Sequence, residues 1–128
     1  GQLANQITEK KKQTHITLKD KNEIEIVAFT DIRYVVAMGG YSKITFIKNK
    51  QEKYIVMSNS IAEYEELLPS EMFFRIHKSH LVNVFDIQTI IKGEQAYTLM
   101  SNGAKLSIGR RRLSGLLHFV KDLKIAHE

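Results

Sequence analysis

The stretch FFRIHKSHLVNV, residues 73–84, decides the fold of this chain. Apolar residues stand at both of its ends, and four polar residues, 77–80, separate Ile76 from Leu81. A strand that alternates between a buried and an exposed face does not normally contain such a gap. We therefore predict a strand, an exposed turn and a return strand. Asn83 stands among apolar residues, so we expect a buried amide that joins two segments of backbone.

The predicted turn is rich in hydrogen-bond donors. It contains His77, Lys78, Ser79 and His80, and the guanidinium of Arg75 is close to it. Each of these groups can donate a hydrogen bond and two are cationic, so the turn suits an anionic partner. Two alternatives are open: one His packs against Phe or Tyr and bonds a backbone carbonyl, or the His-x-x-His spacing binds a metal. The metal alternative lacks a third ligand and any cysteine, and we expect no metal site.

Short alternating segments precede this stretch. We predict strands over residues 16–18, 24–26, 32–38, 41–47 and 53–57, because they are rich in β-branched and aromatic residues. Gly39-Gly40 separates two of these strands, and glycine adopts the positive φ of a tight turn at little cost. Tyr41, Ser42 and Lys43 follow this turn as a second polar candidate site. The alternative is an ordinary turn with Tyr41 packed on the sheet.

Two other segments change to a helical period. Ser60 with Glu63 matches a capping box and Pro69 cannot continue a helix, so we predict about two turns over 60–68. From residue 113, apolar residues recur at three- and four-residue steps, which predicts a C-terminal helix packed on the core. Strands are predicted over 87–92, 95–100 and 104–108, with the hairpin signal Asn102-Gly103. The predicted fold is mainly β: eight to ten short antiparallel strands, one short internal helix and a C-terminal helix.

A third polar candidate site, Arg110-Arg111-Arg112, opens the predicted C-terminal helix. A helix N-terminus carries partial positive charge and favours acidic residues, so three arginines break a local rule. Sites that break local rules are often functional. The alternative is that the arginine stems cover apolar surface while their charged ends stay in water. An anion at this position would bind the guanidiniums together with free backbone N–H groups.

Composition excludes several classes of protein. With 128 residues, 43% of them hydrophobic and 26% charged, the chain is one globular domain. It has no cysteine, and no apolar run approaches the roughly 20 residues that span a bilayer, so we expect a cytoplasmic protein. No Gly-rich phosphate loop, nucleophile elbow or pair of catalytic carboxylates is present, and we expect neither an enzyme nor a cofactor.

Charge is sorted along the chain, with a net value of +5 that favours a polyanionic partner. From Ser70 to Arg112, seven basic residues stand against three acidic ones, whereas residues 61–68 contain three Glu and no base. Residues 1–13 are polar and include Lys10-Lys11-Lys12. We expect a linker or disordered segment there, with a weak phosphate-contacting arm as alternative, before a folded domain over 14–128.

The stretch 73–84, followed by Asn102-Gly103 and by LSIGRR at 106–111, resembles the LytTR family of DNA-binding output domains, mostly of bacterial response regulators. The resemblance runs from about Ile16 to Leu117, and so covers most of the predicted domain 14–128. It implies an elongated fold of three small antiparallel sheets, in which loops rather than a recognition helix reach the DNA. The family often has a serine where Gly109 stands, and a backbone N–H could replace the contact of that hydroxyl.

The resemblance also implies which residues contact DNA. By position they fall in three groups, of which the first two reach successive major grooves: Tyr41, Ser42 and Lys43; Arg75, His77, Lys78 and Ser79; Arg110 and Arg111, with Arg112 beside them. Arginine and lysine can read guanine acceptors, and histidine and serine can donate to bases or phosphates.

We therefore expect sequence-specific binding of double-stranded DNA and regulation of transcription, as the output domain of a two-component response regulator. A receiver domain would precede this chain in the full-length protein, and its phosphorylation would promote dimerisation on paired direct repeats. The alternative is a protein–protein interaction module that uses the C-terminal amphipathic helix. RNA binding is a third interpretation, disfavoured because the predicted turns lack aromatic residues on which unpaired bases could stack.

Overall fold

The computed structural model describes residues 13–127, and this part of the chain forms ten strands, two α-helices and two short 3-10 helices. The strands are β1 His15–Lys19, β2 Ile24–Ala28, β3 Ile32–Met38, β4 Tyr41–Lys48, β5 Gln51–Met57, β6 Phe73–His77, β7 His80–Asn83, β8 Ile87–Ile91, β9 Tyr97–Met100 and β10 Lys105–Ser107. The helices are η1 Phe29–Asp31, α2 Ile61–Leu67, η2 Val84–Asp86 and α3 Leu113–His127. The predicted linker lies almost wholly outside the described residues and stays a prediction.

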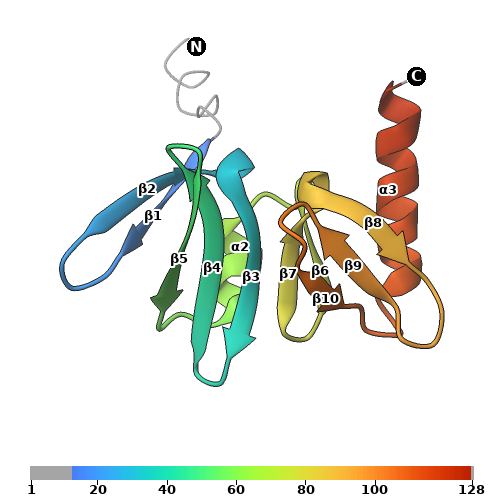
Figure 1. The fold of residues 1–128 in the computed structure, drawn as a ribbon, viewed down its shortest axis with the longest axis horizontal. Coiled ribbons are helices and arrows are strands. Elements are labelled where there is room, and N and C mark those ends of the chain that lie inside the picture. Colours follow the sequence, from blue (N-terminus) through green and yellow to red (C-terminus); the bar gives the residue numbers. More distant parts are fainter. Residues whose placement is uncertain (1–12, 128) are drawn as a thin grey trace, which may run out of the picture.

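The strands form three antiparallel sheets, which confirms the predicted fold class. The central sheet has the order β5-β4-β3-β7-β6, with the pair β1-β2 on one side and β10-β9-β8 on the other (Figure 1). The stretch 73–84 supplies β6 and β7, and β7 pairs with β3 so that Val35 stands opposite Leu81. This pairing places the β6–β7 turn next to the end of β3, where Gly39 begins the following turn with a φ of +62°.

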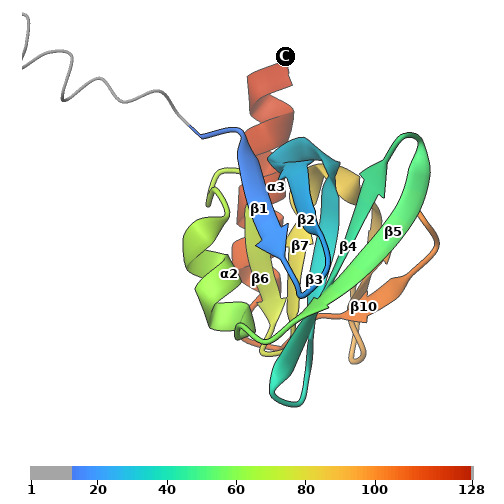
Figure 2. The ribbon, with the colours of Figure 1, turned by 90° about the vertical axis from the view of Figure 1, so that its left-hand side faces the viewer.

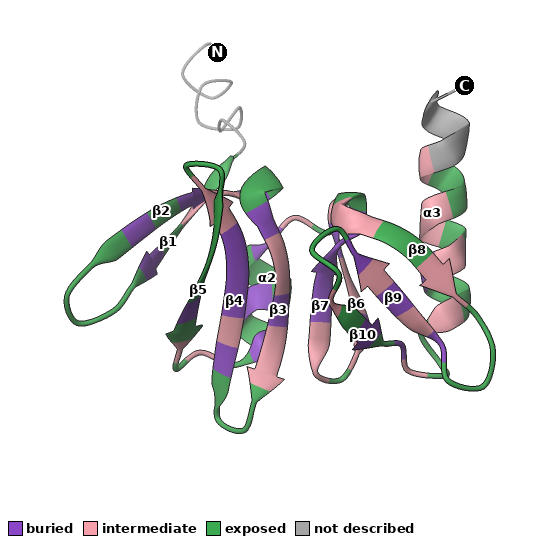
Figure 3. Ribbon diagram, viewed as in Figure 1, coloured by how far each residue is buried: buried purple, intermediate pink, exposed green. Residues whose placement is uncertain are grey.

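Each face of the central sheet covers a different core. In the first core, Val35 packs with α2 and with the pair β1-β2, the first sheet. In the second core, its neighbours Tyr34 and Val36 pack with α3 and with β10-β9-β8, the third sheet. Adjacent residues of a strand point to opposite faces, so β3 contributes to both cores. Buried residues accordingly recur along β3, β4 and β7 (Figure 3). The two cores lie on opposite faces of the central sheet, and in the turned view of Figure 2 the sheet β1-β2 lies in front of the central sheet.

Buried polar side chains fix the chain at the ends of these strands. Asn83, 3% exposed, donates from Nδ2 to the carbonyl of Ile32 at 2.9 Å and accepts from the N–H of Phe85 at 3.0 Å. The prediction for this amide is confirmed. The capping box is only half formed, because Ser60 accepts from the N–H of Glu63 while the Glu63 carboxylate accepts from an asparagine amide instead.

A charged network joins the central and third sheets at the end of the molecule where β3 begins. Arg33 lies 3.3 Å from the carboxylate of Glu52 and 2.8 Å from that of Asp86. The amide of Asn102 donates to the same Glu52 at 2.7 Å and to the Tyr34 hydroxyl at 2.9 Å. The network therefore fixes the spacing between the central sheet and the third sheet, at the end opposite the β3–β4 turn (Figure 1).

Candidate nucleic-acid interface

Three connections gather at one end of the molecule. They are the turn between β3 and β4, the turn between β6 and β7, and the segment between β10 and α3, which all lie at the lower edge in both Figure 1 and Figure 2. One of the three groups of predicted DNA contacts lies in or directly beside each connection. Because their elements belong to the central sheet, the third sheet and α3, the packing of the two halves sets the spacing between these groups.

Backbone and side-chain hydrogen bonds join the β6–β7 turn to the segment before α3. The N–H of Gly109 donates to the carbonyl of Ile76 at 2.7 Å, and His80 donates from Nδ1 to the carbonyl of Ser107 at 2.9 Å. The carbonyl of Ser79 accepts from the N–H of Ala37 at 2.9 Å, which ties the turn to β3 as well. The structure therefore brings the segment of Lys78 next to the segment of Arg110.

The cationic side chains of these segments differ in their surroundings. Lys78, Arg110 and Arg111 are exposed, and within residues 13–123 no carboxylate lies within ion-pair distance of them. Arg112 is also exposed, but its Nη1 donates to the carbonyl of Arg75 at 3.3 Å. Three charges are thus available to a ligand, and the fourth links two segments of the candidate interface.

The sequence had suggested that the three consecutive arginines open the C-terminal helix, but they do not lie inside it. They occupy a turn, and α3 begins at Leu113. The carbonyl of Arg112 accepts the first helical hydrogen bond, from the N–H of Leu116 at 3.0 Å. The arginines therefore precede the free N–H groups of the first turn, and the positive end of α3 faces the same side as the turns.

The group after Gly39-Gly40 belongs to β4 rather than to the turn, and its members point in different directions. Tyr41 is 57% exposed, and Lys43 places its Nζ 4.3 Å from the centre of the Tyr54 ring. Ser42 is fully buried, and its hydroxyl donates to the carbonyl of Asn59 at 2.7 Å. Alternation along the strand explains this difference. Ser42 must therefore be withdrawn from the predicted contact residues.

The two histidines of the β6–β7 turn have structural partners. His80 bonds a backbone carbonyl, as the structural alternative had proposed, but the two rings stack on each other, with centroids 4.7 Å apart, instead of on Phe or Tyr. His77 accepts at Nδ1 from the N–H of Ser79 at 3.0 Å, so its neutral ring carries the proton on Nε2. Burial, followed by the positive charge of His80, Lys78 and Arg75, lowers the pKa of His77 below its ordinary value of 6.5. Neutral His77 can therefore donate from Nε2 while it holds the turn.

We expect the titration of His77 to change the conformation of the turn. A proton on Nδ1 removes the acceptor of the Ser79 N–H, so the Ser79 amide signal should shift with the same midpoint as the His77 ring, below pH 6.5. Because the folded pKa is lowered, the unfolded chain takes up the proton first as the pH falls, and the contribution of this contact to stability is lost towards acid. NMR titration measures both signals. His77→Asn should keep an acceptor and abolish the pH-dependent shift of Ser79; an amide that still titrates would contradict this role.

Arg75 is turned inward instead of towards solvent. Its guanidinium donates to the carbonyl of His77 at 3.0 Å, to the carbonyl of Lys78 and to the carboxylate of Glu65 at 2.8 Å. Sequence reasoning missed Glu65, which lies on α2. The only signal was the contrast between the acidic segment 61–68 and the basic stretch after it, and the pair itself depends on how α2 packs.

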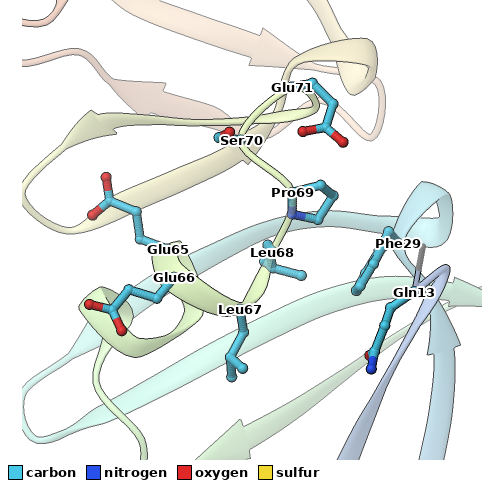
Figure 4. A pocket seen from close by; sticks show the side chains of 9 residues that line it. All are labelled: Gln13, Phe29, Glu65, Glu66, Leu67, Leu68, Pro69, Ser70 and Glu71. Carbon is cyan, nitrogen blue, oxygen red and sulfur yellow. The ribbon is translucent and has the colours of Figure 1, made fainter. Parts of the chain in front are cut away.

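An acidic hollow lies on the far side of Glu65, the residue that pairs with Arg75. It has a volume of about 600 Å³ and is lined by Gln13, Phe29, Glu65, Glu66, Leu67, Leu68, Pro69, Ser70 and Glu71 (Figure 4). Its three carboxylates would repel phosphate, so it does not extend the candidate interface. Within the described residues, no group of three or more potential ligands is placed to hold a metal ion, and no helix is long and apolar enough to cross a membrane.

Comparisons with known proteins point to one family. The family model described as "LytTr DNA-binding domain" matches residues 22–121. Sensory transduction protein LytR of Staphylococcus epidermidis is 37% identical over 79 residues, which are 61% of this chain and 30% of that protein. Transcriptional regulatory protein YpdB of Escherichia coli is 35% identical over 75 residues, 59% of this chain and 29% of that protein. This chain therefore spans about a third of the length of these relatives.

A solved structure has the same fold. The LytTr DNA-binding domain of a putative methyl-accepting/DNA response regulator from Bacillus cereus superposes with a TM-score of 0.73 and 23% sequence identity. The match covers 85% of this chain and 98% of that one. The arrangement of three sheets and a C-terminal helix is thus shared along nearly the whole of that domain.

Proposed function

This chain belongs to the LytTr DNA-binding domain family, and from this premise we propose that it binds double-stranded DNA in a sequence-specific manner through the turns at one end. The observation that supports the proposal is the junction of the β6–β7 turn with the segment before α3, because the first carries Lys78 and the second carries Arg110 and Arg111. Exposed cationic side chains on a fixed backbone can reach base edges as well as phosphates. The proposed activity is binding without catalysis.

Each group of residues takes a different part in this binding. Lys78, Arg110 and Arg111 bring charge, and His77 and the Ser79 hydroxyl bring donors to bases or phosphates. Tyr41 is exposed and Lys43 is half-buried on the face of β4 opposite Ser42, beyond the first turn, and they reach a neighbouring groove. Loops and the end of α3 face the DNA, so no helix needs to lie along the major groove.

The proposal also concerns the longer protein to which this domain would belong. The relatives are named as a sensory transduction protein and as transcriptional regulators, and this chain matches about a third of each. We propose that this chain is likewise the output domain of a bacterial cytoplasmic response regulator, preceded by a receiver domain. Phosphorylation of that receiver would favour a dimer on paired direct repeats.

Gly109 offers a direct test of the contact made by the segment before α3. Its N–H already donates to Ile76, so it is not available to replace the hydroxyl of a serine. A side chain would fit, because an added Cβ would meet its nearest neighbours at 3.6–3.9 Å, ordinary contact distances. Gly109→Ser should therefore strengthen DNA binding by about 0.5–1.5 kcal/mol, the usual contribution of one hydrogen bond. Gly109→Ala is the control, and equal affinities of the two variants would contradict a hydroxyl contact.

Two other functions receive less support. An interaction module would need an exposed apolar stripe on α3, but Leu116 is fully buried and Leu113 and Val120 pack on the second core. RNA binding would need exposed aromatic residues near the turns. Tyr41 and Tyr54 are in fact exposed, on β4 and β5, so single-stranded RNA belongs among the competitors in any binding assay.

Selection of bound fragments from random duplex DNA tests the proposed function. We expect enrichment of a spaced direct repeat. The affinity for the enriched duplex should also fall as salt is added: for each phosphate that the protein neutralises, a tenfold rise in salt should lower the logarithm of the binding constant by about 0.9. Single-stranded RNA should compete poorly. Absence of enrichment together with salt-independent binding would overturn the proposal.

A further inference from the structure

Resting on the proposed function, we infer that Arg75 is a positioning residue that shapes the β6–β7 turn, and that Glu65 of α2 holds it in place. The side chain of Arg75 is only 14% exposed. Its guanidinium is directed at two successive carbonyls of the turn and at one carboxylate. In this role Arg75 presents Lys78 and Ser79 to DNA and makes no DNA contact itself.

The chemistry of the guanidinium suits this task. Arginine carries five N–H donors in one rigid plane, so it can bond several acceptors at fixed angles, which a lysine ammonium cannot do. Here Nε donates to the carbonyl of His77, Nη2 to that of Lys78 and Nη1 to Glu65. Two carbonyls of the turn thereby receive donors from a side chain.

The turn needs such a support because its strands are not regularly paired. The register of β6 and β7 shifts between Arg75 and His77, so the ladder is interrupted just before the turn. The N–H of Ser79 bonds the His77 ring instead of a carbonyl of the partner strand. Side chains therefore determine the path of the backbone that carries Lys78.

Glu65 is placed where electrostatics alone would disfavour it. A carboxylate near a DNA-binding turn repels phosphate, and its removal should by itself strengthen binding. Glu65 nevertheless lies 2.8 Å from the Arg75 guanidinium, and both side chains line a hollow of about 300 Å³ together with Arg112. Its neighbour Glu66 is exposed on the same helix, and among the described residues it has no ion-pair partner (Figure 4).

The two possible roles of Arg75 predict opposite results for Glu65→Ala. If Arg75 contacts DNA, loss of the carboxylate frees its charge, and affinity should rise. If Arg75 positions the turn, loss of the carboxylate loosens the guanidinium, and affinity for the specific duplex should fall by about two- to fivefold, the range for a partly exposed ion pair. Glu66→Ala removes the same charge from the next residue and measures the purely electrostatic change.

The experiment measures dissociation constants of both variants for the enriched duplex and for a scrambled duplex of equal length. We expect Glu65→Ala to lose affinity for the enriched duplex only, and Glu66→Ala to lose none. Arg75→Lys retains the charge but cannot bond both carbonyls, so it should lose at least as much specific affinity as Glu65→Ala. If Glu65→Ala binds as Glu66→Ala does, or if Arg75→Lys binds as the unmodified protein does, the positioning role is wrong.

Hydrogen exchange in the absence of DNA separates this inference from the proposed function. The Ser79 amide should exchange faster in Glu65→Ala than in Glu66→Ala, because the turn opens more often. Equal exchange rates would overturn the positioning role even if the protein binds DNA. Failure of the unmodified protein to bind any duplex would instead overturn the proposed function.

Discussion

Lys78→Ala should weaken binding to the enriched duplex by about 1–3 kcal/mol, roughly a five- to 150-fold loss, which is the range for a cation that reads a base. The ammonium is exposed at the tip of the β6–β7 turn, whose backbone is held by Arg75, His77 and Ala37. The backbone is thus already ordered before binding, so little conformational entropy is lost there. Arg110→Ala, on the adjoining segment, should have an effect of the same size.

Matched measurements separate base contacts from general electrostatics. Lys121→Ala removes an exposed charge from α3, away from the turns, and should change affinity little. If Lys78 reads a base, its replacement should cost much less affinity on a scrambled duplex than on the enriched one. Equal losses on both duplexes would show that Lys78 touches phosphate alone, and a loss no greater than that of Lys121→Ala would remove it from the interface.

Leu116→Ala should lower the free energy of unfolding by about 2–5 kcal/mol, a large part of the stability of a domain this size. Leu116 is fully buried in the second core, between α3 and the third sheet. Truncation removes apolar contacts and leaves a cavity that the antiparallel strands around it cannot easily close. Denaturant unfolding measures the change. The arginine turn directly precedes α3, so a less stably packed α3 should also disturb the candidate interface.

An exposed position on the same helix provides the control. The side chain of His118 is 79% exposed, so His118→Ala should change the free energy of unfolding by no more than about 0.5 kcal/mol. A change below about 1 kcal/mol for Leu116→Ala would mean that α3 is not docked in solution. The apolar stripe would then be available to a partner, as the alternative function requires.

Local patterns predicted most of the fold. The strand over residues 32–38 has the predicted bounds, and the stretch 73–84 forms the expected strand, turn and strand. Alternation and turn residues are signals that neighbouring residues carry, so they can be recognised without knowledge of the tertiary structure. The buried amide of Asn83 was predictable for the same reason, since a polar residue within an apolar run needs a partner.

The parts of the site that escaped prediction depend on contacts distant in sequence. Ser42 was predicted as a contact together with Lys43, and the sequence could not show that the face of β4 on which Ser42 lies is covered by the segment around Asn59. The pair of Arg75 with Glu65 depends on the packing of α2 against the central sheet. The sequence suggested that a backbone N–H could replace a serine hydroxyl at Gly109, but the N–H of Gly109 itself donates to Ile76 of β6, because the two segments lie side by side.

Backbone NMR of the domain titrated with the enriched duplex tests the central claim most directly, because it reports every surface at once. We predict that the largest amide shifts cluster at residues 39–43, 77–80 and 107–112, the three connections at the lower edge of Figure 1. The outer face of β1 and β2 and the exposed face of α3 should change little. Large shifts on those two faces, with the three connections unchanged, would contradict the claim that these turns bind DNA.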